Sequence, residues 1–340
     1  MVARLPLNLC HLSNDMLRAI SEFCDLETRC AVTCTNSALK LGILGSVTLS
    51  CEGSERFLHD DAFRQRISRR VFLPSANLHL QVISRKFKES QIDILNAVRS
   101  VFLYTGKRKL FRDIKEGKLD PRWTTQLSRM HTLSKLSIGG TRTRVADVTP
   151  LAGLTSLTYL DLSNTRVADV GSLKSLTSLT HLNLRCTRVS DVSALAGLKN
   201  LTFFDLAFTL VSDVSKLERL TKLTRLDLKE TQVSDVSALA GLRNLTELNL
   251  SYTQVSDLSA LAGLTNLAVL DLENTQATDV SALAALTKLT YLNLSETEVS
   301  SVSALAGLSK LTSLFLFGLY VTDVSSLSDL KKLQITYDAG

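Results

Sequence analysis

The chain has 340 residues, and its 45% hydrophobic content is normal for a folded protein. No apolar run reaches the roughly 18 residues of a membrane span, and the first residues lack the apolar stretch of a signal peptide. We therefore expect an intracellular protein, cytoplasmic or nuclear, and not a secreted or membrane protein. The net charge of +6 is uneven: residues 1–132 carry 21 Lys and Arg against 13 Asp and Glu, and residues 133–340 carry 18 against 20.

Residues 1–40 predict a compact helical segment. Its apolar side chains recur at helical spacing: Leu12, Met16, Leu17, Ile20 and Phe23. Five of the six cysteines also lie in the first 51 residues, and Cys30 and Cys34 are placed to share a helical face near Cys24 and His11. Because these spacings fit no zinc motif, we favour small buried thiols over a metal site.

This segment resembles an F-box, the short helical motif that docks on the adaptor Skp1. The resemblance covers about 30 residues, LSNDMLRAISEFCDLETRCAVTCTNSAL (12–39), and departs from the motif at Ser13 and Cys24 and in the missing Trp after Cys34. The matching positions are Leu12, Asp15, Met16, Leu17, Ile20, Phe23, Asp25 and Cys34. The resemblance implies that the five apolar side chains above contact Skp1. The alternative is a helical cap on the repeats that follow.

Residues 41–132 predict irregular repeat turns. Strand-like pieces at 46–50, 76–82 and 100–104 alternate with polar helical stretches. Basic runs lie between residues 64 and 118, which is typical of a surface that meets an acidic or nucleic-acid partner. Acidic residues are interleaved and no aromatic stacking platform accompanies the charge, so we favour a solvated face and do not favour nucleic-acid binding.

From Leu133 to the end, the pattern L-x-x-L-x-L-x-x-T-x-V-x-D-V-x-x-L-x-x-L recurs every 22 residues, after a first unit with two extra residues. The leading leucines are Leu157, Leu179, Leu201, Leu223, Leu245, Leu267, Leu289, Leu311 and Leu333. A fixed period of this length predicts a solenoid, in which each unit buries its apolar face against its neighbours. The chain thus divides into residues 1–40, 41–132 and 133–340.

The regular units resemble the 22-residue leucine-rich repeats of internalins and of the Sds22-type phosphatase regulator. The resemblance covers about 60% of the chain and implies an α/β solenoid with a parallel β-sheet on its concave side. A unit of 22 residues has no room for a full outer helix, so the convex side should consist of short 3-10 or irregular turns.

Three polar columns recur in the units, and we interpret all three as structural. One holds buried threonines that need backbone partners: Thr165, Thr187, Thr209, Thr231, Thr253, Thr275 and Thr297. A second is expected to cap the outer turns: Asp169, Asp191, Asp213, Asp235, Asp257, Asp279 and Asp323. The third lies on the strands: Asp161, Asn183, Asp205, Asp227, Asn249, Asp271 and Asn293. We expect its members to bond one another; the alternative is an acidic groove for a basic peptide.

Partner recognition is predicted where the units vary. One strand column changes chemistry from unit to unit, and two units, 201–211 and 311–321, carry aromatic side chains at positions that are polar elsewhere. The candidate partner-binding residues are Tyr159, His181, Phe203, Phe208, Leu210, Arg225, Tyr252, Tyr291, Phe315, Phe317 and Tyr320. For the second aromatic unit, a buried C-terminal cap is an equal alternative.

Function is expected to be binding without catalysis. The five histidines are scattered outside any nucleophile, zinc or phosphate motif, so we expect neither an enzyme nor a cofactor. An F-box-like head with leucine-rich repeats resembles the substrate receptors of Skp1–cullin–F-box ubiquitin ligases, which hold a substrate protein on the concave face. The alternative is a scaffold or regulatory subunit of a phosphatase, cytoskeletal, axonemal or ribonucleoprotein assembly.

Overall fold

A computed structural model describes residues 133–138, 145–319 and 323–337, and the backbone of three strands nearer the N-terminus. The chain divides into two compact units, Met1–Tyr104 and Thr105–Gly340. Several predicted features lie outside the described residues: the F-box-like segment with its five docking side chains, the cysteines near His11, the basic runs and Tyr320. The three-part division of the sequence stays a prediction.

The described residues of the first compact unit form three parallel strands. They are β1 (Ser46–Leu49), β2 (Asn77–Val82) and β3 (Val98–Leu103). Ser46 pairs with Asn77 in the first ladder, and Leu80 pairs with Val101 in the second. These strands confirm the three strand-like pieces of the sequence, with bounds that differ by at most two residues.

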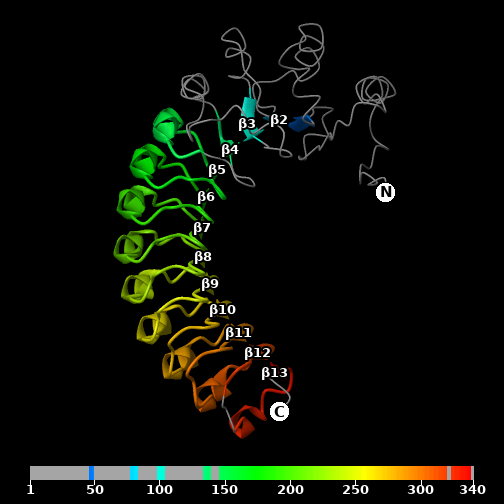
Figure 1. Cartoon of the computed structure of the whole chain (residues 1–340). Helices are drawn as coiled ribbons and strands as arrows, with labels where there is room; N and C mark the ends of the chain where they lie inside the picture. Colours follow the sequence, from blue (N-terminus) through cyan, green and yellow to red (C-terminus); the bar gives the residue numbers. More distant parts are fainter. Residues whose placement is uncertain are drawn as a thin grey trace, which may run out of the picture. The chain divides into compact units, whose positions relative to one another are not determined.

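The second unit contains ten short parallel strands, each paired with the next one in the chain (Figure 1). They are β4 (Lys135–Ser137), β5 (Tyr159–Asp161), β6 (His181–Asn183), β7 (Phe203–Asp205), β8 (Arg225–Asp227), β9 (Glu247–Asn249), β10 (Val269–Asp271), β11 (Tyr291–Asn293), β12 (Ser313–Phe315) and β13 (Gln334–Thr336). Equivalent positions pair across the sheet, as Tyr159 does with His181. Lys135 pairs with Tyr159, which confirms the two extra residues of the first regular repeat, the one that begins at Leu133.

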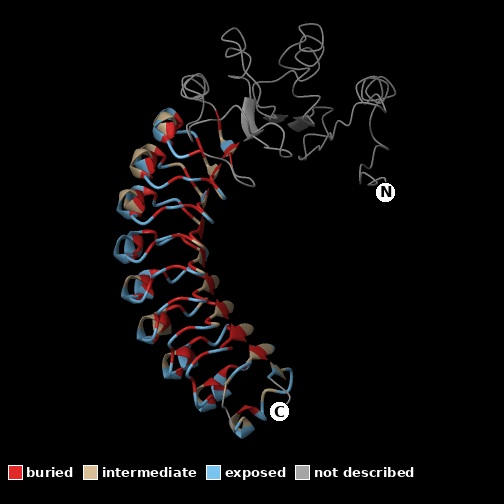
Figure 2. Ribbon diagram, in the orientation of Figure 1, coloured by how far each residue is buried: buried red, intermediate tan, exposed pale blue. Residues whose placement is uncertain are grey.

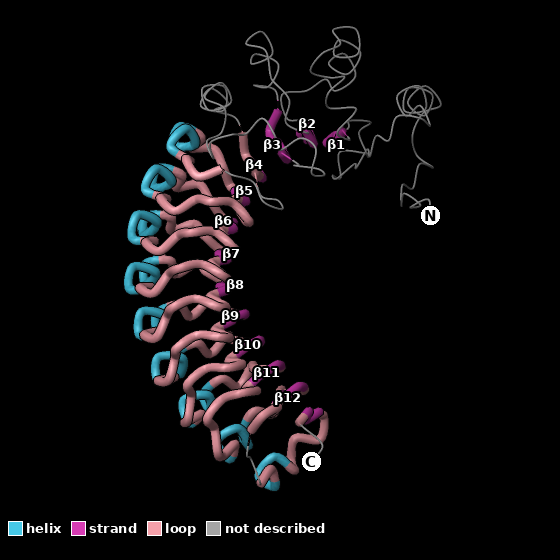
Figure 3. Tube along the Cα trace, viewed as in Figure 1, coloured by secondary structure: helices cyan, strands magenta, loops and turns pink. Residues whose placement is uncertain are grey.

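Short 3-10 helices form the other side of each turn. They are η4 (Thr149–Gly153), η5 (Gly171–Ser175), η6 (Ser193–Gly197), η7 (Ser215–Arg219), η8 (Ser237–Gly241), η9 (Ser259–Gly263), η10 (Ser281–Ala285), η11 (Ser303–Gly307) and η12 (Ser325–Leu327). Within this unit the strands follow one edge of the stack and the 3-10 helices follow the opposite edge (Figure 3). This arrangement confirms the predicted solenoid and its short convex turns.

The core lies between the two edges, where buried residues form a continuous layer (Figure 2). Leu160 and Leu162 of β5 and its following turn, and Leu173 of η5, are all fully buried. Burial of one such leucine stabilises the fold by about 1.5–3 kcal/mol. Phe204 takes a leucine position in β7 and is also buried, so the core accepts one larger side chain there.

The buried threonine column bonds inside its own unit. Each hydroxyl donates to the carbonyl oxygen three residues earlier, as Thr209 Oγ1 does to Leu206 at 2.6 Å. A different threonine column, which the sequence interpretation missed, links neighbouring units: Thr202 Oγ1 donates to the carbonyl of Thr180 at 3.0 Å. The expected backbone partners are therefore confirmed, but the ladder between units belongs to the second column.

The outer-turn aspartates bond to the first N–H of the 3-10 helices, from the position before the N-cap valine or leucine. Asp213 Oδ1 accepts the backbone N–H of Ser215 at 2.7 Å, and the same bond recurs in the other units that carry this Asp. In the one unit with Ser301 instead, the N–H of Ser303 lies 3.4 Å from the hydroxyl oxygen. The carboxylate is the stronger acceptor because it is ionised.

Each regular unit also contains one residue in the left-handed backbone region. The residues with positive φ are Asn164, Cys186, Phe208, Glu230, Tyr252, Asn274 and Glu296, with Gly318 at the equivalent place in the last full unit. Their N–H groups bond to the next unit, as that of Phe208 does to Lys229 O at 2.8 Å. The stack therefore imposes a conformation that is unfavourable for any residue with a Cβ atom.

Candidate binding surfaces of the repeat array

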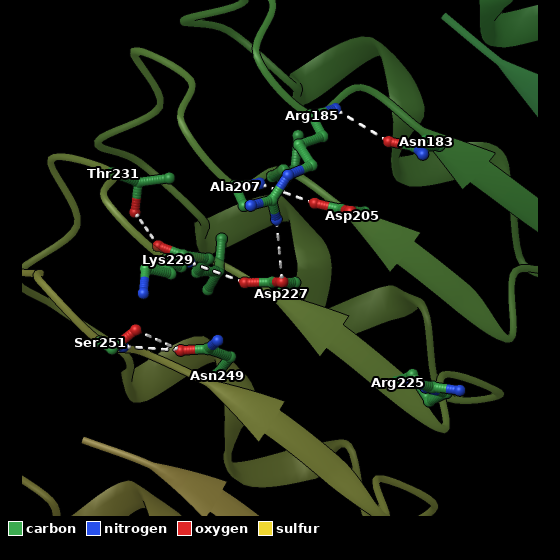
Figure 4. Close-up of polar contacts among 12 residues, drawn as sticks. Asn183, Arg185, Asp205, Ala207, Arg225, Asp227, Lys229, Thr231, Asn249 and Ser251 are labelled. Atoms are coloured by element: carbon green, nitrogen blue, oxygen red, sulfur yellow. Dashed lines mark hydrogen bonds and ion pairs between the residues drawn. The ribbon is translucent and has the colours of Figure 1, made fainter. Parts of the chain in front are cut away.

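The Asp and Asn column is formed by the last residue of each strand from β5 to β11. Each member accepts the backbone N–H two residues later through its side-chain oxygen, as Asp205 does from Ala207 at 2.9 Å and Asn249 from Ser251 at 2.9 Å (Figure 4). The expected bonding of these side chains to one another is thus largely replaced by bonds to the backbone. This recurring turn explains why Asp and Asn alternate freely: both supply the one oxygen that the turn needs.

Burial leaves some of these carboxyl groups easy to protonate. Burial raises the pKa of Asp205 to about 6, although the N–H of Ala207 favours the ionised form. Burial also raises the pKa values of Asp227 and Asp271. Arg185 lies 3.6 Å from Asp227 and stabilises its charge (Figure 4). The column is therefore part of the scaffold, with its charge partly offset from within the sheet.

A second column forms a continuous contact chain, which we call the concave strip: Tyr159, His181, Phe203, Arg225 and Glu247. The Tyr159 and His181 rings lie 6.0 Å apart, and His181 stacks on Phe203 at 5.8 Å. The Arg225 guanidinium lies 5.6 Å from the centre of the Phe203 ring and 2.7 Å from a Glu247 carboxylate oxygen. Four of the predicted partner-binding residues are thus brought together on the neighbouring strands β5 to β8, and Glu247 of β9 joins them.

The histidine of the concave strip favours its neutral form. Burial and the nearby Lys135 charge lower the pKa of His181, and its Nδ1 lies 2.9 Å from the hydroxyl of Thr180. Burial and Asp161 raise the pKa of Tyr159. At neutral pH the strip therefore offers uncharged rings at one end and an ion pair at the other.

The C-terminal aromatic group lies on the last strands. Tyr291 and Phe315 rings are 5.2 Å apart, and Phe315 and Phe317 rings are 6.4 Å apart. Strand β13 pairs with β12, yet Phe317 keeps 36% of its surface exposed. The group is thus followed by one further strand, as a C-terminal cap requires, and keeps an accessible ring, as an interface requires. Tyr337, which the sequence interpretation missed, is 61% exposed because it follows the last strand.

Three other predicted residues lie beyond the ends of the strands, apart from the concave strip. Phe208 and Tyr252 have positive φ, and Leu210 is two residues further along. The Arg185 guanidinium lies 4.5 Å from the Phe208 ring centre, and Lys229 Nζ lies 4.8 Å from that of Tyr252. Unit 201–211 thus contributes to two surfaces, a distinction that periodicity alone did not make.

Figure 4 makes the separation visible within one unit. Arg225 lies at the start of β8, Asp227 lies near its end, and Lys229 and Thr231 lie beyond it. The strand start belongs to the concave strip and the turn after the strand belongs to a different border of the sheet. The surface to which a residue belongs therefore depends on how far along the chain it lies from the start of the strand in its unit.

The described residues contain no group of three or more His, Cys, Asp or Glu side chains that could hold a metal ion. Cys186 is exposed and has a free thiol. Among the helices of the described part of the chain, none combines the length and apolar character of a membrane span.

Comparison with known proteins identifies the repeats. The family model described as Leucine Rich repeats (2 copies) matches residues 155–197 and 243–285. None of the curated proteins matches the chain.

Three solved structures share the architecture. An internalin (inlF) from Listeria monocytogenes is 23% identical, with 100% of this chain and 99% of that chain covered and a TM-score of 0.70. Internalin C2 of the same species is 34% identical over 57% of this chain and 83% of its own, with a TM-score of 0.51. A leucine-rich repeat protein of Leptospira interrogans is 18% identical over 89% and 81%, with a TM-score of 0.63. The regular units therefore have the leucine-rich repeat fold and form an open solenoid.

Proposed function

We propose that the repeat array is a non-catalytic binding module and that the concave strip contacts a protein partner. The observation that carries this proposal is the uninterrupted contact chain from Tyr159 to Glu247. Equivalent strand positions elsewhere hold Val269 and Ser313, so the fold itself does not require aromatic rings there. Leucine-rich repeats in general present such surfaces to protein partners.

The residue types of the strip suit a protein segment. Tyr, Phe and Arg supply large contact areas and dominate binding energy at protein interfaces. Five strands spaced about 4.8 Å apart span about 19 Å, which matches about six residues of an extended peptide. The adjoining Asp column adds negative potential, which favours a partner segment with a basic residue.

The double substitution His181→Ala and Phe203→Ala tests this proposal. We expect partner binding to weaken at least about tenfold, because truncated interface anchors typically cost more than 1.4 kcal/mol together. Val269→Ala is the matched control, since Val269 occupies the same column outside the strip. Partners would be recovered by affinity purification with quantitative mass spectrometry and then titrated as purified proteins. Equal affinities for the double variant and the wild type would contradict the proposal.

A finer proposal makes the chain a substrate receptor of a Skp1–cullin–F-box ubiquitin ligase, acting inside the cell. Its support is the sequence resemblance of residues 12–39. Recombinant Skp1 should be captured by the wild type and lost on the double change Leu17→Asp and Phe23→Asp, with the repeats still folded. Failure of the wild type to capture Skp1 would end the receptor proposal and leave the concave strip untouched. Recovery of phosphatase, cytoskeletal or ribonucleoprotein subunits without cullin would favour the scaffold alternative.

A further inference from the structure

The turns that follow the strands carry a second surface, which we call the basic flank. Its residues are Arg166, Arg185, Arg188, Phe208, Leu210 and Lys229. Backbone bonds between units hold these turns in register. The N–H of Leu210 donates to Val189 O at 2.9 Å, and the N–H of Phe208 donates to Lys229 O at 2.8 Å.

The two apolar members of the basic flank are not needed by the fold. Leu210 is 50% exposed, and the next three units hold Gln232, Gln254 and Gln276 at its position. Phe208 has a φ of 58°, a region in which Asn is tolerated better than a bulky side chain. The stack imposes this backbone on every regular unit, so it is the presence of Phe and Leu, at positions that hold polar or charged residues in most other units, that indicates a surface kept for contact with a partner.

Charge along this border is strongly divided. We compare three turn positions in each unit, those of Ser163, Asn164 and Arg166 and their equivalents 22 residues apart. In the four units from Ser163 to Gln232 these positions hold four cations and one anion. The same positions in the next three units, from Ser251 to Glu298, hold no cation and three anions. The apolar pair therefore lies within the positive half of the border.

Two of the four cations of the basic flank are available to an anionic partner, whereas Lys229 lies over the Tyr252 ring. Arg166 and Arg188 are exposed, and neither has an ion-pair partner in the described part of the chain. Arg185 covers one face of Phe208 and lies 3.6 Å from Asp227, so it is fixed in place beside the ring. Positive side chains around an apolar pair complement negative side chains around an apolar anchor.

We infer that the basic flank binds an acidic protein segment whose bulky apolar side chain packs on Phe208 and Leu210. This site is separate from the concave strip and does not depend on the proposed function. A nucleic acid fits less well, because Leu210 offers no stacking face and Arg185 already covers one face of Phe208. Four units span about 14 Å, which suits about four or five extended residues.

The test uses the full chain and three fluorescent probes: a ten-residue peptide of alternating Glu and Leu, the corresponding Lys and Leu peptide, and a 20-nucleotide polyuridine RNA. Anisotropy titrations at low and high salt should show preferential binding of the Glu and Leu peptide, weakened by salt. The double variant Phe208→Asn and Leu210→Gln should weaken this binding about fivefold to tenfold. Its melting temperature should stay equal or rise, since both new residues occupy these positions in other units.

Glu296→Asn is the matched control. It changes a residue with positive φ in the same column, outside the positive half and without a contact to the basic flank, and should leave peptide affinity within about twofold. His181→Ala and Phe203→Ala should also leave it unchanged, which separates this site from the concave strip. Preference for the Lys and Leu peptide or for RNA, equal binding by the flank double variant, or self-association that occupies the flank in light scattering would each overturn the inference.

Discussion

Two neighbouring units, 201–214 and 223–236, share one scaffold and differ in what they expose. Both have a three-residue strand and a threonine hydroxyl bonded to the carbonyl three residues earlier, at 2.6 Å for Thr209 and 2.7 Å for Thr231. Both cap the outer turn with an Asp, at 2.7 Å in the first unit and 2.8 Å in the second. The two units thus have the same backbone structure and the same buried hydrogen bonds, although their residues outside the core differ.

The positions outside the core have opposite character in the same two units. The first unit has half-buried Phe203 and Phe208 and exposed Leu210, whereas the second has exposed Arg225, Glu230 and Gln232. Positions fixed by the stack determine stability, and positions free of it are available for recognition. A residue that departs from the repeat pattern therefore indicates a binding function only at a position that the packing of the stack does not fix.

The largest expected effect separates two leucines of one unit. Leu206→Ala should lower the free energy of unfolding by about 2.7–5 kcal/mol, because Leu206 is fully buried and its loss leaves a cavity. Leu210→Ala should change it by less than about 0.5 kcal/mol, because half of that side chain is already exposed. Chemical denaturation of the two variants measures both values. Comparable losses would break the distinction between scaffold and exposed positions.

A smaller effect tests whether the two units share their scaffold. Thr209→Val and Thr231→Val each remove one buried hydroxyl bond and keep the side-chain volume, so each should cost about 1 kcal/mol. The two losses should agree within about 0.5 kcal/mol, the usual spread for independent sites. A large difference, measured by the same denaturation, would show that the Phe-rich unit is held differently from its neighbour.

The pH dependence of stability gives the smallest and most specific effect. The pKa of Asp205 is about 6 in the folded chain, above the value of about 3.9 for an unfolded Asp. Stability from its protonated form is complete below about pH 4 and is lost as the pH rises through about 6. Asp205→Asn keeps the oxygen that accepts the Ala207 N–H and should reduce this loss, as seen in denaturation from pH 4 to pH 7. Asp227 and Asp271, whose pKa values burial also raises, leave a remaining slope in the variant. A slope equal to that of the wild type would contradict the assignment.

Asp213 supplies the control of opposite sign. The N–H and hydroxyl of Ser215 lower its pKa in the folded chain, so its stabilising contribution is present above about pH 4 and is lost on further acidification. Asp213→Asn should therefore alter the acid limb and leave the range from pH 5 to pH 7 unchanged.

Much of the scaffold was predictable because each unit repeats the same solution. The period predicted the strands, the 3-10 turns and the buried leucines. The side-chain chemistry predicted that the buried threonines and outer-turn aspartates would bond to backbone. It did not separate bonds within a unit from bonds between units, so the role of Thr202 and its equivalents was missed. The Asp and Asn column bonds mainly to backbone N–H groups, and Asp271 with Asn293 is a pair that bonds as expected.

The candidate sites were less predictable, because they depend on which border of the sheet a residue joins. Phe203 and Phe208 are five residues apart, yet one stacks on His181 and the other lies under Arg185. The left-handed backbone at Phe208 has no signature in a single sequence, since Asn, Cys, Glu and Tyr occupy the same column. Such contacts arise from the stacking of neighbouring units and not from any one unit.

One triple variant tests the division between scaffold and recognition most directly. Phe203→Ser, Phe208→Asn and Leu210→Gln introduce residues found at the same positions elsewhere in the array, at Ser313, Asn164 and Gln232. The measurement is the free energy of unfolding of this variant against the wild type. We predict a change of less than about 1 kcal/mol in either direction, as for surface substitutions. A loss of several kcal/mol would contradict the account, because these three side chains would then be part of the scaffold.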